Sequence, residues 1–307
     1  MPKRLPIFIC FAIWITSCAS PASSGAISLS DLKPLEPVVS PDILPLRVAV
    51  ANVISPTGTL ESYTPLVRYL GRKLGRPVEL LQRRTYAETN ELILRGEADL
   101  AFVCTSAYVA GHEDFGMELL AAPVVNGDTV YYSVLIVPSD SEAESIDDLR
   151  GKTFAFTDPM SNSGRLYPNI MVHELGETPE HFFSNTFFTY SHDDAILSVA
   201  QGVADGAAVD SLVLEFTLAR NPELAEQIRI IHFSPPFGIP PVVVGPEIRP
   251  QLQEELEEAL LQMHLDTEGQ KALSSLDIER FVLIEDNAYD TVREMVSALE
   301  MGENSAR

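Results

Sequence analysis

The sequence predicts an α/β protein that folds as two lobes, and three observations support this fold class. Short β-branched strands alternate with amphipathic helical stretches from residue 46 to 112, in an order typical of a parallel sheet covered by helices. The same alternation begins again at residue 130 and continues to residue 227. The Pro-rich stretch 228–245 has the pattern of two strands that cross between lobes. We therefore expect two similar α/β lobes joined by two crossing strands.

The elements of the first lobe follow from periodicity and from glycine stops. Residues 46–53 alternate and are β-branched, which indicates a strand. Leu66, Val67, Leu70 and Leu74 share one helical face, and Gly75 ends that helix. The expected elements are strands 46–53, 77–82 and 98–104 and helices 63–75, 86–96 and from 105 onward.

The second half repeats this pattern and is followed by helices near the end of the chain. The expected strands are 130–138, 153–159, 185–190 and 204–211. The expected helices are 145–152 with Ser145 as its N-cap, 169–176, 191–202, 215–227, 251–264 and 289–299. Pro168 predicts that the helix after the loop 161–164 begins at Tyr167 or kinks after one turn. We assign residues 46–132 plus 235–307 to the first lobe and 133–234 to the second.

Length, composition and charge narrow the class of protein. A chain of 307 residues with 46% hydrophobic and 21% charged residues has enough material for about two domains with large cores. Lys and Arg number 21 against 44 Asp and Glu, a net charge of −23 that disfavours nucleic acid and anionic membrane surfaces as partners. The sequence shows no metal-ligand cluster or phosphate-binding P-loop, so we expect no metal or cofactor.

The N-terminus is predicted to be an export signal, residues 1–17. Lys3 and Arg4 precede the uncharged apolar run 7–16, which is too short to span a bilayer as a stable helix. The run ends in Ile-Thr-Ser-Cys, which resembles the lipobox of bacterial lipoproteins and implies lipidation of Cys18. Residues 18–45 would then form a lipid anchor and a flexible Ser/Pro/Ala-rich tether.

The alternative for this segment is ordinary cleavage after a small residue, near Ala19 or Ala22. The lipoprotein interpretation predicts an exported protein that faces the periplasm or cell exterior and touches the membrane only through its anchor. Cys10 would leave with the signal, so Cys104 would be the remaining cysteine of the folded part, which excludes an internal disulfide. Cys104 lies in an apolar run and is expected to be a small buried core residue.

Hydroxyl-rich loops occur at three junctions between a strand and the following helix: 104–107, 161–164 and 190–193. Ligands of parallel α/β sheets bind outside the carboxyl ends of strands, where helix N-termini offer free N–H groups. Gly164 lets the backbone approach closely, and Ser and Thr add rotatable donors. These loops predict an oxyanion cradle made of neutral donors. Each loop alone could be an ordinary helix cap, and so could His192 or Asp210.

The segment 157–168, TDPMSNSGRLYP, resembles the signature of the phosphate/phosphite/phosphonate-binding proteins of bacterial ABC transporters. The resemblance extends from about residue 46 to 244 and includes SIDDLRGKTFAF and SHDDAILSVAQG. It implies the type II periplasmic binding protein fold, with two α/β lobes, two crossing strands and a ligand in the cleft.

The resemblance also implies the residues that bind the ligand. In the second lobe these are the Ser-x-Ser loop, a His at the next helix start and an Asp after the following strand. In the first lobe they are an aromatic residue and the loop at 104–107, where this sequence departs from the Gly-Pro-Leu-Ser of many members. The implied ligand-binding residues are Tyr86, Thr105, Ser106, Ser161, Asn162, Ser163, His192 and Asp210.

Three functions are compatible with these sequence features. The first is a monomeric lipid-anchored solute-binding protein that delivers phosphite, phosphonate or phosphate to an ABC permease. The second is the same binding protein acting as a ligand-sensing input to a membrane receptor kinase, which the sequence does not separate from transport. The third is a serine hydrolase using Ser163, His192 and Asp210, but Gly-x-Ser-x-Gly is absent around Ser163. The sequence therefore favours a binding protein and not an enzyme.

The choice of ligand is predicted from the acids near the site. Asp210 would accept a hydrogen bond from a P–OH group and repel sulfate. Residues 211–214 and 234–241 contain no acid, and Glu215 is expected to point away. Phosphite or a short alkylphosphonate should therefore bind better than 2-aminoethylphosphonate. Tyr86 and Tyr108 are expected to close the cleft, and protonation of His192 is expected to make binding depend on pH between about 6 and 8.

Overall fold

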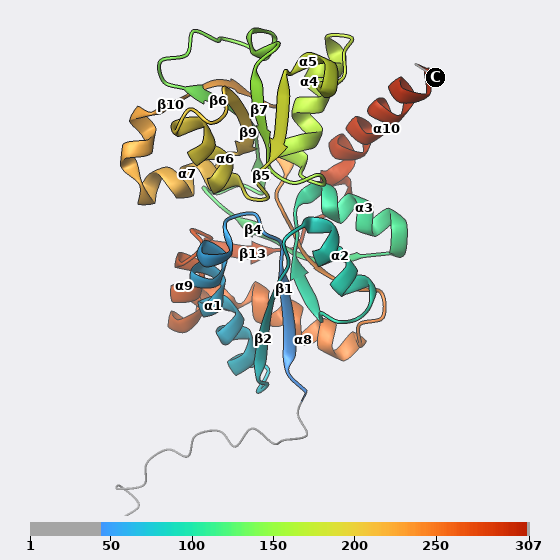
Figure 1. Ribbon diagram of the computed structural model, residues 1–307. Helices are drawn as coiled ribbons and strands as arrows, with labels where there is room; N and C mark the ends of the chain where they lie inside the picture. The colour runs from blue at the N-terminus through green and yellow to red at the C-terminus, as the bar shows by residue number, and fades with distance from the viewer. Residues whose placement is uncertain (1–43, 306–307) are drawn as a thin grey trace, which may run out of the picture. The chain divides into compact units, whose positions relative to one another are not determined.

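The computed structural model describes residues 44–305, with side chains to residue 302. The predicted signal peptide, Cys18 and nearly all of the predicted tether lie outside these residues. Within 44–305 the strands form two large sheets and one two-stranded ribbon (Figure 1). No helix of this part of the chain is both long and apolar enough to cross a bilayer.

The first large sheet has a parallel half and an antiparallel half. β1 pairs in parallel with β2 and β3, with Leu46 opposite Val78 and Val48 opposite Leu100. The strands that complete the sheet run antiparallel to their neighbours. In sheet order the strands are β13 (Arg280–Val282), β4 (Glu118–Val124), β12 (Val242–Val244), β3 (Leu100–Phe102), β1 (Leu46–Val50) and β2 (Val78–Gln82). We call this sheet and its helices the first lobe.

Helices cover both faces of this sheet. One face carries α1 (Pro56–Lys73), α8 (Pro250–Leu261) and α9 (Thr267–Ser274), whose Leu, Val and Ala side chains share one buried cluster. The other face carries α2 (Tyr86–Leu94) and α3 (Thr105–Phe115) in a second cluster. α1 begins seven residues before the predicted helix because Pro56 occupies its first turn, where a missing N–H costs no intrahelical bond.

The second large sheet has the same mixed character. β7 pairs in parallel with β8 and β9, whereas β6 pairs antiparallel with β9 and β10. In sheet order the strands are β10 (Ile228–Phe233), β6 (Ser133–Pro138), β9 (Gly206–Asp210), β7 (Thr153–Phe156) and β8 (Asn185–Phe188). We call this sheet and its helices the second lobe.

The alternation of β6 shows how this sheet fills two cores. Val134 and Ile136 point into a cluster with α6 (His192–Ala200) and α7 (Ser211–Arg220). Leu135 and Val137 point to the opposite face, toward α4 (Tyr167–Glu174) and α5 (Pro179–Phe182). Successive strand residues face opposite sides of a sheet, so one strand supplies both clusters.

A two-stranded ribbon lies between the two large sheets (Figure 1). It consists of β5 (Val130–Tyr131) and β11 (Phe237–Gly238), which pair antiparallel with Phe237 opposite Tyr131. The chain therefore passes between the lobes twice in extended form. α10 (Asp290–Ser305) lies against both α3 and α4, so this last helix contacts both lobes.

The helix predicted over 145–152 is wrong in length and in its cap. The structure has only a single 3₁₀ turn, Asp147–Leu149. Ser145 does not cap it; the Asp148 carboxylate instead accepts hydrogen bonds from the backbone N–H and the hydroxyl of Ser145, both at 3.0 Å. An acidic side chain inside the turn thus binds the backbone N–H groups that precede it, and no side chain caps the turn itself.

Candidate functional site

The loop after β7 is shaped by a serine cap and a glycine. Ser161 precedes a π-helical turn, Asn162–Leu166, and its Oγ accepts a hydrogen bond from the Gly164 N–H at 3.0 Å. A Cβ on Gly164 would lie 1.9 Å from Thr157 Oγ1, so only glycine lets the turn pack against β7. α4 then begins at Tyr167, as one of the two alternatives for Pro168 predicted.

Four buried polar atoms around this loop have no hydrogen-bond partner within the described part of the chain. They are Tyr86 Oη, Thr157 Oγ1, Asn162 Oδ1 and Ser163 Oγ. More than nine in ten buried polar groups in proteins are hydrogen-bonded, and an unpartnered one costs about 1–3 kcal/mol. Such a concentration of unpartnered atoms is expected where a polar ligand supplies the missing hydrogen bonds. We call these four residues, with Ser161, His192 and Asp210, the cradle.

Tyr131 and Cys104 connect the cradle to the crossing strands and to the first lobe. Asn162 Nδ2 donates to Tyr131 Oη at 2.9 Å, and Tyr131 belongs to β5. Burial raises the pKa of the Cys104 thiol to about 11, while the backbone N–H groups of Asn162 and Ser106 act in the opposite direction. Cys104 is buried, as predicted, but it also lies where the loops of the two lobes meet.

His192 is held as a neutral donor. Its Nδ1 accepts a hydrogen bond from the backbone N–H of Asp210 at 3.0 Å, which leaves the ring proton on Nε2. Burial lowers the pKa of His192 to about 3 because no carboxylate stabilises its charged form. Burial thus opposes the protonation of His192 that was expected to make binding depend on pH between about 6 and 8.

Asp210 is the group whose pKa lies near neutrality. Burial raises the pKa of its carboxyl to about 7, although hydrogen bonds from the N–H groups of Leu212 and Val213 favour the ionised form. Its Oδ1 accepts these bonds at 2.8 and 3.4 Å, so Asp210 caps α7. The residue thus performs the structural role considered from the sequence and still presents a carboxyl to the cradle.

The structure does not assemble a hydrolytic triad. In a serine hydrolase the serine is hydrogen-bonded to the histidine, and the histidine to the carboxylate. Here Ser163 Oγ has no partner among the described residues, and His192 Nδ1 faces the Asp210 amide and not its carboxyl. The three residues predicted for that alternative are near one another without the bonds that the chemistry needs.

Thr105 and Ser106 use their hydroxyls within the protein. Thr105 Oγ1 donates to the carbonyl of Gly238 at 2.8 Å. Ser106 Oγ donates to the carbonyl of Met160, which belongs to the second lobe. Both lie at the start of α3 beside the cradle, but neither hydroxyl proton is free for a ligand in this arrangement.

The two lobes contact each other directly beside the cradle. Asn52 Nδ2 donates to the Tyr190 carbonyl at 2.8 Å, and the Ser55 N–H donates to Asp193 Oδ1 at 2.8 Å. The backbone N–H of Tyr86 donates to Asp158 Oδ2 at 3.1 Å. These bonds join residues 72 and 138 positions apart, and sequence reasoning did not single out Asn52 or Asp158. The Asp-Pro of the 157–168 segment was the one signal that could have indicated Asp158.

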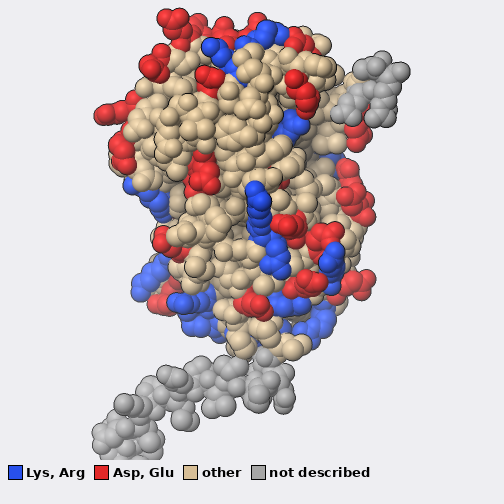
Figure 2. Space-filling model, in the orientation of Figure 1, with Lys and Arg blue, Asp and Glu red and all other residues tan. Residues whose placement is uncertain are grey.

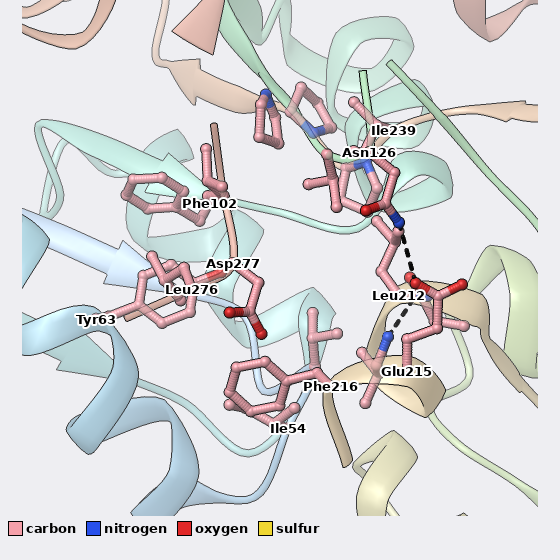
Figure 3. Close-up of a pocket in the computed structure, with 18 of the residues that line it drawn as sticks. Ile54, Tyr63, Phe102, Asn126, Leu212, Glu215, Phe216, Ile239, Leu276 and Asp277 are labelled. Atoms are coloured by element: carbon pink, nitrogen blue, oxygen red, sulfur yellow. Dashed lines mark hydrogen bonds between the residues drawn. The ribbon is translucent and has the colours of Figure 1, made fainter. Parts of the chain in front are cut away.

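Asp210 lines a cavity of about 420 Å³. Figure 3 shows side chains that line this cavity. Its walls are mainly apolar and come from both lobes. Glu215 lines it and accepts a hydrogen bond from Asn126 Nδ2 at 3.1 Å, so the prediction that Glu215 points away is wrong. Tyr108 does not line it; its Oη bonds to Asp286 and its ring packs on Tyr289, which corrects the expectation that it closes the cleft.

Within residues 44–302 no group of three or more His, Cys, Asp or Glu side chains is arranged to hold a metal ion. On the face shown in Figure 2, acidic and basic side chains are interspersed. The cradle itself contains no lysine or arginine, so its donors are hydroxyls, an imidazole and backbone amides.

Curated proteins similar to this chain include a phosphate-import protein, a probable phosphite-binding protein and a phosphonates-binding protein. A phosphate-import protein PhnD of Mycolicibacterium smegmatis is 34% identical over 163 residues, which are 50% of this chain and 51% of that protein. The chain thus spans about half the length of this curated relative.

Two solved structures share the fold. A binding protein component of an ABC phosphonate transporter from Pseudomonas aeruginosa superposes with a TM-score of 0.81 at 22% identity, covering 87% of this chain and 90% of that one. PhnD1 from Prochlorococcus marinus, solved in complex with methylphosphonate, superposes with a TM-score of 0.76 at 20% identity, covering 86% and 99%.

These likenesses confirm the predicted two-lobed type II periplasmic binding protein fold. The model of one family, described as "ABC transporter, phosphonate, periplasmic substrate-binding protein", matches residues 48–289, which is most of the chain. This chain belongs to the family of phosphonate periplasmic substrate-binding proteins of ABC transporters.

Proposed function

We propose that this chain captures a small phosphorus oxyanion in the cradle and delivers it, as a monomer, to an ABC permease. The observation that carries this proposal is the set of four buried, unpartnered polar atoms around the Ser-x-Ser-Gly loop. Three of them are hydroxyls that can donate to an oxyanion, and His192 Nε2–H adds a fourth donor. The names of the relatives, which include phosphate import and a methylphosphonate complex, support the same class of ligand.

The cradle also contains acceptors, which set the protonation state of the ligand. Asn162 Oδ1 is unpartnered, and Asp210 has a pKa raised to about 7 by burial. An oxyanion with one P–OH group can donate to such an acceptor, whereas sulfate has no proton to offer at neutral pH. We infer that the ligand binds as a monoprotonated phosphorus oxyanion.

The test is a thermal-shift comparison of the purified full-length chain with phosphate, phosphite, methylphosphonate, 2-aminoethylphosphonate and sulfate. Ligand at about 100 times its dissociation constant adds about 2.7 kcal/mol to stability, which such an assay detects. We expect stabilisation by at least one phosphorus oxyanion and none by sulfate. Stabilisation by none of the phosphorus compounds would overturn the proposed function, and equal stabilisation by sulfate would overturn the role of the P–OH group.

We further propose that Cys18 carries a lipid anchor, although it lies outside the described residues. The support is the Ile-Thr-Ser-Cys sequence after a short apolar run. Changing Cys18 to Ala should move the protein out of the membrane fraction or leave it unprocessed, and Cys10→Ala serves as the matched control because it lies within the signal. A correctly processed Cys18→Ala protein that stays in the membrane fraction would reject lipidation.

A further inference from the structure

The cavity beside Asp210 is larger and more apolar than an inorganic oxyanion needs. Sixteen of its twenty lining residues are apolar or aromatic, and its volume is about 420 Å³. A dry cavity of about 150 Å³ lined by apolar side chains is large enough to bind benzene. In Figure 3 Tyr63, Phe102 and Leu276 form one side, and Leu212 of the second lobe lies opposite.

Asp210 belongs to both the cavity wall and the cradle. It lines the cavity, and its backbone N–H donates to His192 of the cradle. Its charge acts on Tyr63, a cavity residue, and on Tyr86, a cradle residue, whose pKa values both lie above the usual range chiefly because of burial. The two spaces are thus neighbours on either side of one carboxyl group.

The acids around the cavity are already engaged by protein groups. Glu215 accepts from Asn126, and Asp277 pairs with Arg220 at 3.2 Å. Asp210 uses one oxygen to cap α7. An ammonium group would have to displace these partners, whereas an apolar group would meet the apolar side chains between them. Both polar pairs join one lobe to the other, so they bridge the cavity along its outer side.

We propose that the ligand of this protein carries a bulky apolar organic group, such as an aryl or branched alkyl chain, and that this group occupies the cavity while the phosphorus oxygens occupy the cradle. The proposal rests on the proposed function and narrows its substrate class to organophosphonates or phosphate monoesters with an apolar substituent. Because the cavity walls come from both lobes, such a group would be buried only when the lobes are closed.

The test is calorimetric titration of the purified full-length chain with methylphosphonate, n-butylphosphonate, phenylphosphonate and 2-aminoethylphosphonate. One extra methylene in a hydrophobic pocket changes affinity by about 10–200-fold, so phenylphosphonate should bind at least about tenfold tighter than methylphosphonate. Phe216 of α7 also lines the cavity, outside the cradle (Figure 3), so Phe216→Ala should reduce this preference while methylphosphonate still binds. Leu218→Ala, on the same helix but packed in the core of the second lobe, is the matched control and should preserve the preference. Leu276→Trp, which fills the cavity, should abolish binding of the phenyl compound selectively.

The outcomes separate this inference from the function beneath it. Methylphosphonate binding equal to or tighter than phenylphosphonate binding would overturn the apolar substituent and leave the proposed function intact. Tightest binding of the aminoethyl compound would show that the cavity acids receive a cation, which also overturns it. If both Phe216→Ala and Leu276→Trp still prefer phenylphosphonate, the apolar substituent does not occupy the cavity, and the proposal is overturned. Failure of every phosphorus compound to bind would overturn the proposed function itself.

Discussion

Asp210 should make the stability of the unliganded protein depend on pH, and Asp210→Asn should remove this dependence. Burial raises the pKa of this carboxyl from 3.8 to about 7 in the folded chain. The asparagine that replaces it does not ionise, yet its Oδ1 can still accept the hydrogen bonds from Leu212 and Val213 that cap α7. The substitution therefore changes the charge with little change in the cap.

The sign and size follow from proton linkage. Between pH 3.8 and 7 the folded protein binds the Asp210 proton more tightly than the unfolded chain does, so the free energy of unfolding falls as pH rises. Each unit of pKa difference corresponds to about 1.36 kcal/mol. The free energy of unfolding should therefore be about 4 kcal/mol lower above pH 7 than below pH 3.8. Between pH 5 and 7 the free energy of unfolding should fall by about 2 kcal/mol. The free energy of unfolding of Asp210→Asn should therefore rise by this amount relative to that of the wild type over that range. Above pH 7 the difference between the two proteins should stay nearly constant.

Urea unfolding followed by circular dichroism at intervals from pH 5 to 8.5 measures the difference. Asp140→Asn is the control, because Asp140 is exposed and a surface change of this kind alters stability by less than about 0.5 kcal/mol. A constant difference between Asp210→Asn and wild type across the range would refute the reasoning. It would mean that water or a structural change relieves the buried carboxylate of its cost.

Two further predictions concern the Ser-x-Ser-Gly loop. Ser163→Ala should weaken phosphite or phosphonate binding by about 1.5–3 kcal/mol, the scale of a hydrogen bond to a charged group, when compared by calorimetry with Ser198→Ala on the outer part of α6. Unchanged affinity would remove Ser163 from the site. Gly164→Ala should lower the urea midpoint by the equivalent of about 1–3 kcal/mol, because its Cβ would overlap Thr157. Gly58→Ala in α1, whose Cβ would meet the flexible end of Ile54 at 3.3 Å and not at 1.9 Å, should lower it much less; a similar loss in both variants would contradict the packing argument.

The strands that could be predicted are those whose own residues alternate or are β-branched because the strand is buried. β1 and β7 are short, β-branched or aromatic runs with a strand on either side, and their pattern is local. β4 was missed because its sequence, ELLAAPV, has no clean alternation and contains Pro123. It is a strand because β12 and β13 pair with it on either side, and both partners come from more than a hundred residues later in the chain.

The candidate site likewise has features that a local sequence pattern predicts and features that depend on contacts between the lobes. Sequence reasoning placed the loops 104–107, 161–164 and 190–193 at junctions between strands and helices, where the structure has them, since strand ends and helix starts can be read from local pattern. It did not find which hydroxyl is free. The Ser161 hydroxyl accepts from its own turn and the Ser106 hydroxyl donates across the lobes, while the Ser163 hydroxyl has no partner in the described part of the chain. That assignment depends on contacts between the lobes, and no local pattern contains them.

Burial is the common cause of the electrostatics of the cradle. The same exclusion of water that holds His192 neutral raises the pKa of Asp210, so neither residue is forced to carry a full charge near neutral pH. Under the proposed function, a chain of net charge −23 binds its anion with neutral donors and with one carboxyl, Asp210, that shares a proton with the ligand. Charges elsewhere on the surface are screened over about 8 Å at physiological salt, so they contribute little to this encounter. Recognition then depends on how many hydroxyl and N–H groups reach the ligand once the lobes are closed, which is why the unpartnered oxygens are a better guide to the site than any charged patch.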